Sequence, residues 1–180
     1  MIKTYLHKMK TKQKRPPAKP ISKILWSAVG SFLGIYLIAV FGKLFSTDFV
    51  FLLGSFGASA VLVYGAPEAP FSQPRNLIGG HILSAFCGVI CVKIFGFLPF
   101  EILCAVSVAL SVFVMHFTAT MHPPGGATAL IYVMGSDLYT IGWLYPIAPI
   151  GVGAFLMLIV ALLVNNLSSN EKRHYPVYWI

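Results

Sequence analysis

Apolar residues dominate this 180-residue chain and occur in long stretches separated by short polar or turn-forming segments. Five stretches stand out: residues 24–42, 49–64, 77–98, 102–118 and 147–164. Several approach the roughly 20 residues that an α-helix needs to cross a bilayer core about 30 Å thick. A further apolar segment, residues 127–134, is too short to cross unaided. The pattern predicts an all-α integral membrane protein with about six hydrophobic segments, four of them long spans and two of them short or broken half-helices.

Composition supports a membrane location for the whole chain. Hydrophobic residues make up 57% of the sequence, charged residues only 10%, and the mean hydropathy is +0.81. Soluble domains carry about 25% charged residues. We expect one transmembrane domain over residues 24–166, between a basic tail (1–23) and a C-terminal tail (167–180), with no separate soluble catalytic module.

Residues 121–126 interrupt the apolar sequence with a histidine, His122, followed by two prolines and two glycines. Proline has no backbone N–H and restricts the residue before it, whereas glycine turns through angles closed to other residues. The pattern predicts a helix that ends, a tight non-helical corner, and a new helix from Ala127. In lipid such a break survives only inside protein or beside a wet cavity. It is therefore either a packing kink or loop, or a substrate site built on a broken helix.

A second segment resembles this corner. Residues 57–62 (GASAVL) match the later residues 126–131 (GATALI). We interpret the match as an internal duplication with halves of residues 24–95 and 100–165, although small-residue runs also coincide by chance. Three crossings per half would invert one half relative to the other, so that two helix N-termini converge near the midplane.

Converging helix N-termini present free N–H groups and partial positive charge, which favour a small anion. In this hypothesis the hydroxyls of Ser59 and Thr128 add donors. The predicted substrate-binding residues are Gly57, Ala58, Ser59, Gly126, Ala127, Thr128 and His122.

Three further polar residues interrupt the apolar pattern near the third span. Arg75 and Asn76, beside Gln73, are candidates for a polar gate, although a lone arginine in a membrane protein also meets lipid headgroups. His81 lies inside an apolar run, where ionisable residues mark functional sites or satisfied packing contacts. We predict a gating or proton-relay role for Arg75, Asn76 and His81.

Metal and cofactor chemistry finds little support in the sequence. Cys87, Cys91 and Cys104 read as small packing residues rather than ligands. The pairs Met115–His116 and Met121–His122 are of a kind that soft copper could use, but no cysteine or carboxylate joins them at a recognisable ligand spacing. We expect no cofactor and no resident metal.

The basic tail holds eight of the 13 Lys and Arg residues and much of the net charge of +8. Beside a membrane span it predicts a cytoplasmic anchor for anionic lipid rather than a nucleic-acid site. Lys172 and Arg173 place the C-terminus on the same side. Two topologies stay open: six crossings put Arg75 inside and Lys93 outside, and four spans with two re-entrant hairpins reverse them.

Motifs spread over residues 24–180 resemble the HPP family of small integral membrane proteins. They include residues 56–60 (FGASA), 65–67 (GAP), 73–76 (QPRN), 79–81 (GGH), 122–130 (HPPGGATAL), 165–167 (NNL), Tyr175–Pro176 and Trp179. Members in cyanobacteria and chloroplasts are linked to nitrite transport. The resemblance implies a transporter, with nitrite as the implied substrate.

The residues and the resemblance together predict a permease for a small inorganic anion in the bacterial plasma (inner) membrane, with both termini cytoplasmic and the lipid bilayer as partner. The rival hypothesis is a membrane-bound enzyme or metal-handling protein that uses His81, His116 and His122. Asp137 and Glu101 fall in predicted loops, so an in-membrane general base is not evident, and we expect no enzymatic activity. A structural partner subunit and homo-oligomerisation stay open.

Overall fold

The computed structural model describes residues 2–10, 13–44, 52–168 and 173–180, and within these ranges all regular structure is helical. Four long apolar helices have the length and hydropathy to cross a membrane: Ile21–Leu44, Pro74–Phe95, Phe100–Phe117 and Gly142–Asn166. Two short helices, Gly54–Gly65 and Pro123–Met134, lie between them in the chain. The predicted all-α membrane architecture, with four long and two short segments, is confirmed.

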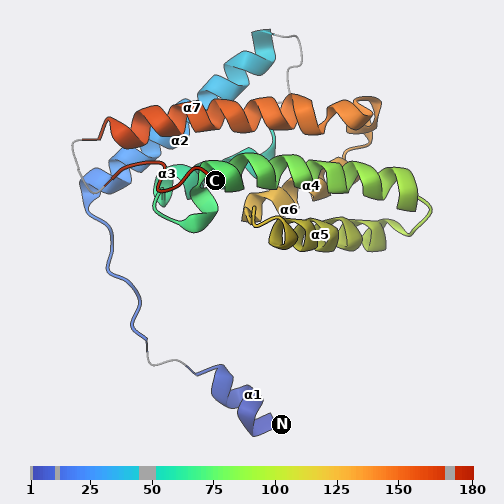
Figure 1. Cartoon of the computed structure of the whole chain (residues 1–180), viewed down its shortest axis with the longest axis horizontal. Coiled ribbons are helices and arrows are strands. Elements are labelled where there is room, and N and C mark those ends of the chain that lie inside the picture. The colour runs from blue at the N-terminus through green and yellow to red at the C-terminus, as the bar shows by residue number, and fades with distance from the viewer. Residues whose placement is uncertain (1, 11–12, 45–51, 169–172) are drawn as a thin grey trace.

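The helices follow one another in a repeated order of long, short and long. The first half contains α2 (Ile21–Leu44), α3 (Gly54–Gly65) and α4 (Pro74–Phe95). The second half contains α5 (Phe100–Phe117), α6 (Pro123–Met134) and α7 (Val152–Asn166), with the short helical turns Ser136–Thr140, Gly142–Leu144 and Pro146–Gly151 before α7. The short helix α1 (Ile2–Lys8) lies apart from the bundle in Figure 1.

Packing between the helices follows the same repeat. α5 packs against α6 and α4, and its counterpart α2 packs against α3 and α7. α6 also packs on α4 as α3 packs on α7, and the two short helices touch each other. Figure 1 shows α2 and α5 running in opposite directions, and likewise α4 and α7. Order, direction and packing therefore agree with two inverted three-segment halves.

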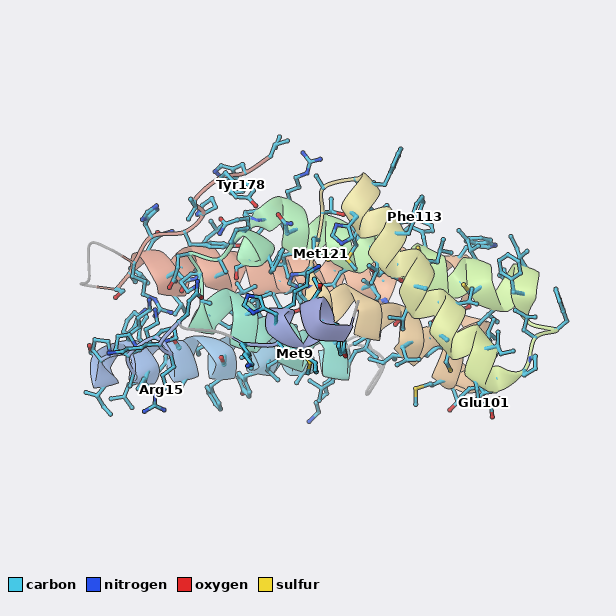
Figure 2. The ribbon with its side chains drawn as sticks, turned by 90° about the horizontal axis from the view of Figure 1, so that it is seen from below. Met9, Arg15, Glu101, Phe113, Met121 and Tyr178 are labelled. Carbon is cyan, nitrogen blue, oxygen red and sulfur yellow. The ribbon has the colours of Figure 1, made fainter. Side chains whose placement is uncertain are left out.

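The two ends of the bundle carry different parts of the chain. Glu68, which lies between α3 and α4, accepts hydrogen bonds from Lys19, just before α2, and from Lys23 in the first turn of α2. The helices α2 and α4 therefore begin at the same end. Arg75 is at that end. Lys93 lies near the end of α4, its ammonium 6.0 Å from the Trp143 ring. Figure 2 correspondingly places Arg15 and Glu101 at opposite ends of the long axis. This arrangement matches the six-crossing alternative.

Labelling of introduced cysteines tests this topology in intact vesicles. Phe71 and Phe97 are 43% and 81% exposed and lie at opposite ends of the bundle. We expect Phe71→Cys and Phe97→Cys to react with a membrane-impermeant maleimide from opposite sides. The parent chain is the background control, because Cys87 and Cys91 are buried but Cys104 on α5 is partly exposed. Labelling of both positions from one side would contradict six crossings.

The expected start of the second short helix is wrong by one turn. Pro123 and Pro124 do not form a corner outside the helix but occupy its first two positions, and α6 begins at Pro123. Proline suits these positions because the first N–H groups of a helix have no partner within it and the fixed φ angle is already helical. Similarly, α3 begins at Gly54, ahead of Gly57.

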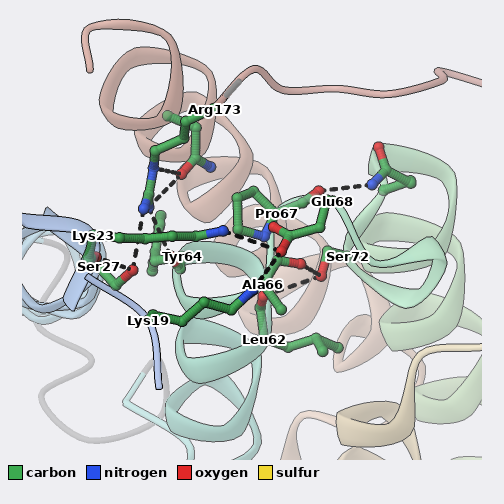
Figure 3. A network of polar contacts seen from close by, with 12 residues as sticks. Lys19, Lys23, Ser27, Leu62, Tyr64, Ala66, Pro67, Glu68, Ser72 and Arg173 are labelled. Atoms are coloured by element: carbon green, nitrogen blue, oxygen red, sulfur yellow. Dashed lines mark hydrogen bonds and ion pairs between the residues drawn. The ribbon is translucent and has the colours of Figure 1, made fainter. Parts of the chain in front are cut away.

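The C-terminal tail is packed onto the end of the bundle that carries the connection between α3 and α4. Buried Arg173 donates hydrogen bonds to the Tyr64 carbonyl at 2.7 Å, to Asn165 Oδ1 and to Ser27 Oγ. Figure 3 shows this guanidinium beside the α3–α4 connection. Tyr175 is buried and donates to the Ser72 carbonyl. The tail thus ties α2, α3 and α7 together.

Ion pairs between Glu68 and two lysines, Lys19 and Lys23, lie at the same end of the bundle. Partial burial opposes ionisation of Glu68, but a hydrogen bond from its own backbone and the neighbouring Lys23 and Lys19 outweigh it and hold the pKa of this carboxyl below its ordinary value. The Glu68 and Lys19 side chains are exposed to solvent and Lys23 is only partly buried, so these ion pairs contribute little to stability.

Candidate functional site

Four polar side chains from both halves meet in the interior of the bundle. Ser59 of α3, His81 of α4, His122 before α6 and Thr128 of α6 are each 0% exposed. We call them the histidine cluster. All four were predicted from the sequence as substrate-binding or relay residues, and the structure brings them together.

Hydrogen bonds connect the histidine cluster into one chain. The Ser59 hydroxyl lies 2.7 Å from His81 Nε2 and 2.8 Å from His122 Nε2. The opposite nitrogen of His81 lies 2.7 Å from Thr128 Oγ1. His122 Nδ1 lies 2.8 Å from the carbonyl oxygen of Phe71, on the connection between α3 and α4. Each ring nitrogen therefore has a partner, as buried polar groups require.

Glycines allow the elements of the cluster to approach one another. A Cβ atom at Gly80 would overlap His122 Cβ and lie 2.8 Å from the Thr120 carbonyl oxygen. A Cβ atom at Gly125 would lie 2.7 Å from the Gly80 carbonyl oxygen and from Ser84 Oγ. Both positions require glycine because the backbones of α4, α6 and the segment before α6 touch directly.

The predicted gate residues hold the segment between α5 and α6. Arg75 donates to the Thr118 carbonyl at 2.8 Å, and Asn76 donates to the Met121 carbonyl at 2.8 Å. Asn76 also accepts from the Tyr178 hydroxyl of the C-terminal tail. These hydrogen bonds fix the segment that carries His122, and none of them goes to a side chain of the cluster.

Three buried side-chain atoms in the described part of the chain lack a hydrogen-bond partner: Ser55 Oγ, Arg75 Nε and Ser84 Oγ. Ser55 lies one helical turn before Ser59 on α3, and Ser84 lies one turn after His81 on α4. All three are on the two helices that carry Ser59 and His81. An unpaired buried donor costs free energy, so its persistence calls for an explanation such as a ligand.

Ser55 and Ser84 were missed by the sequence analysis. The signal was present, because Ser55 and Ser59 are four positions apart, and His81 and Ser84 three apart, in otherwise apolar helices. Residues with these spacings lie on the same helix face.

The predicted backbone donors have a different environment from the one expected. Since α3 begins at Gly54 and α6 at Pro123, Gly57, Ala58, Gly126 and Ala127 lie inside the helices rather than at their first N–H groups. At the start of α6, the two prolines have no N–H and Gly125 donates to the His122 carbonyl. A role of these four residues in substrate binding stays a prediction.

The Met–His pairs do not converge as one ligand set. His116 is exposed on α5 and outside the cluster. Met115 is buried, and its sulfur accepts the His122 backbone N–H at 3.5 Å. Within the described ranges, no three His, Cys, Asp or Glu side chains are grouped so that they could hold a metal ion. The expectation of no resident metal and no cofactor stays a prediction.

Long apolar helices around a fully buried polar cluster define an integral membrane protein with an interior polar site. Residues 16–176 match the family described as HPP, transmembrane region, and the chain belongs to this family. It is also similar to two transmembrane proteins of Dictyostelium discoideum. Each is 44% identical to it, over 97% of this chain and 57% of the first relative, and over 93% of this chain and 60% of the second.

The chain spans about 57–60% of the length of these curated relatives. They are named only as transmembrane proteins, which supports the membrane assignment. No solved structure matches the chain.

Proposed function

We propose that this HPP family protein is a permease for a small inorganic anion, and that nitrite is its substrate. The proposal is transport and not catalysis, in a bacterial inner membrane with both termini cytoplasmic. The basic N-terminal tail supports this orientation, because Lys and Arg accumulate on the cytoplasmic side.

The observation that carries the proposal is a set of buried donors without a partner. Ser55 Oγ, Ser84 Oγ and Arg75 Nε lie on α3 and α4, the two helices that carry Ser59 and His81 of the histidine cluster. The described side-chain carboxylates, Glu68, Glu101 and Asp137, are all on exposed residues. Unpaired buried donors, with no buried carboxylate among the described residues, suit an anion, whereas a cation site would present carboxylate oxygens.

The inverted halves support transport in particular. Many transporters bind substrate near the midplane where two inverted repeats meet at broken helices. Here Ser59 and Thr128 occupy the same position in the two matching segments, GASAVL and GATALI, and both join the cluster. The cluster is closed on all sides in this conformation, as expected for one state of an alternating-access carrier.

Nitrite fits the proposed site by its chemistry. It is a small planar anion whose oxygens accept hydrogen bonds from hydroxyl and N–H donors. The family resemblance points to the same ion. Chloride, nitrate and formate are the competitors against which selectivity is to be measured.

Uptake into sealed proteoliposomes tests the proposal. We expect saturable nitrite entry above that of empty liposomes, with a weaker response to the other anions. The absence of saturable entry for every anion of the panel would refute the proposed function.

Ser84→Ala separates function from folding in the same assay. A hydrogen bond to a charged ligand is worth about 1.5–3 kcal/mol, so nitrite affinity is expected to fall roughly ten- to a hundred-fold. Thermal stability is expected to stay equal or to rise, because the variant removes a buried hydroxyl that has no partner.

Ser111→Ala is the matched control for Ser84→Ala. Ser111 is equally buried and donates to the Ser107 carbonyl within α5. We expect it to keep the affinity of the parent protein. An affinity unchanged in Ser84→Ala would remove Ser84 from the substrate site.

A further inference from the structure

The positions of the hydrogens in the histidine cluster follow from its contacts when both rings are neutral. The Phe71 carbonyl only accepts, so His122 carries its hydrogen on Nδ1 and accepts at Nε2. The Ser59 hydroxyl therefore donates its hydrogen to His122 Nε2. Because Ser59 has only one hydrogen, His81 must donate from Nε2 to Ser59 and accept at Nδ1 from Thr128. The two rings are therefore opposite tautomers.

In this neutral arrangement, two short contacts between a hydroxyl and a carbonyl oxygen have no hydrogen between them. Ser59 Oγ also lies 3.1 Å from the Ser55 carbonyl oxygen, and Thr128 Oγ1 lies 3.3 Å from the Pro124 carbonyl oxygen. Each hydroxyl has already donated its one hydrogen to a ring. The cluster thus holds more hydrogen-bonding contacts than its neutral form has hydrogens.

One added proton fills one of these contacts without moving a heavy atom. If it binds His122 Nε2, that nitrogen donates to Ser59, and the Ser59 hydroxyl turns to the Ser55 carbonyl. If it binds His81 Nδ1, that nitrogen donates to Thr128, and the Thr128 hydroxyl turns to the Pro124 carbonyl. Each alternative acceptor lies one helical turn before its hydroxyl, so the two halves supply it in the same way.

We propose that the histidine cluster is a proton-binding site that takes up one proton together with each transported anion. This inference rests on the proposed function. A single proton is expected because the ring centroids are only 4.9 Å apart and two buried cations would repel each other.

The transported anion supplies the negative charge that balances a protonated histidine. A buried cation is costly without an opposite charge, and the described side-chain carboxylates are exposed. Other titratable side chains around the cluster donate to backbone: Tyr145 to the Thr128 carbonyl and Arg75 to the Thr118 carbonyl. On α3, Tyr64 donates to the Met157 carbonyl of α7, and α7 itself carries no titratable residue. An incoming anion therefore supplies the missing charge.

Nuclear magnetic resonance of histidine side-chain nitrogens in the full chain, reconstituted in bilayers, tests the proton site directly. At about pH 8, without anion, we expect His81 protonated at Nε2 and His122 at Nδ1. On acidification with nitrite, one of the two rings is expected to become a cation. Identical neutral tautomers, or two rings that stay neutral with nitrite throughout the folded range, would overturn the proposal.

Proton movement in proteoliposomes tests the coupling. With a pH-sensitive dye inside, an inward nitrite gradient is expected to drive protons inward faster than in protein-free liposomes, which correct for nitrous acid leakage. Ser59→Ala is expected to lower this protein-dependent proton entry at least tenfold, and Ser111→Ala to leave it unchanged. Thr128→Val, which keeps the side-chain shape, is a second variant should Ser59→Ala fail to fold.

The outcomes separate the two proposals. Nitrite entry without protein-dependent proton entry would overturn the coupling and leave the permease standing. Entry of no anion would refute the permease, and the nitrogen spectra would still decide whether the cluster binds a proton.

Discussion

Gly80→Val is expected to abolish transport and to destabilise the protein by on the order of 3 kcal/mol. The added Cβ atom would overlap His122 Cβ and lie 2.8 Å from the Thr120 carbonyl oxygen. Neither neighbour can turn aside, because one is a backbone atom and the other is directly attached to backbone. The segment before α6 must therefore move off α4, which separates His122 from Ser59.

Thermal unfolding in detergent and nitrite uptake measure the two effects. Gly54→Ala is the control, because among the described residues no atom beyond its chain neighbours and its own helix backbone lies within 4 Å of a Cβ built there. We expect the control to retain both stability and uptake. A stable and active Gly80→Val protein would mean that the contact between α4 and the segment before α6 is not needed for the site.

The fold was largely readable from the sequence because the membrane simplifies the problem. Helices are the spanning structure that long apolar stretches form, and a stretch long enough to cross the bilayer core identifies each span. The short match between residues 57–62 and 126–131 indicated the repeat. The start of α6 was misjudged, because proline was treated as a break although it is well tolerated in the first turn of a helix.

The side chains of the site were predicted better than its backbone. His81, His122, Ser59 and Thr128 stood out as polar residues in apolar surroundings, and they do meet. Their mutual hydrogen bonds could not be read from the sequence, because they depend on how α3, α4 and α6 cross. The crossings depend on glycines such as Gly80, whose close neighbours, Thr120 and His122, belong to the other half of the chain.

The C-terminal tail illustrates a second limit. Lys172 and Arg173, after the last span, predicted only the side of the membrane on which the C-terminus lies. In the structure Arg173 is 5% exposed, and its hydrogen-bond acceptors lie on three different helices. No local sequence pattern predicts such contacts, because one of the acceptors of Arg173, Ser27, lies near the opposite end of the chain.

Arg173→Met is expected to destabilise the protein by roughly 3 kcal/mol, because the carbonyl of Tyr64 and the side-chain oxygen of Asn165 would lose their donor. Methionine keeps the length and apolar stem of the side chain, so the loss reports on hydrogen bonding more than on packing. Arg15→Met is the control, since Arg15 is exposed. A shift in thermal unfolding equal for both variants would contradict the structural role of Arg173.

The same variant is expected to disturb the histidine cluster as well, because the tail holds the connection between α3 and α4. Tyr175 donates to the Ser72 carbonyl at 2.8 Å, and the neighbouring Phe71 carbonyl accepts from His122. Loosening the tail should therefore let the connection between α3 and α4 shift and weaken the bond that fixes the His122 tautomer. The histidine nitrogen spectrum of Arg173→Met, recorded below its unfolding temperature, should then show His122 exchanging between both tautomers. A His122 signal identical to that of the parent protein would confine the role of Arg173 to global stability.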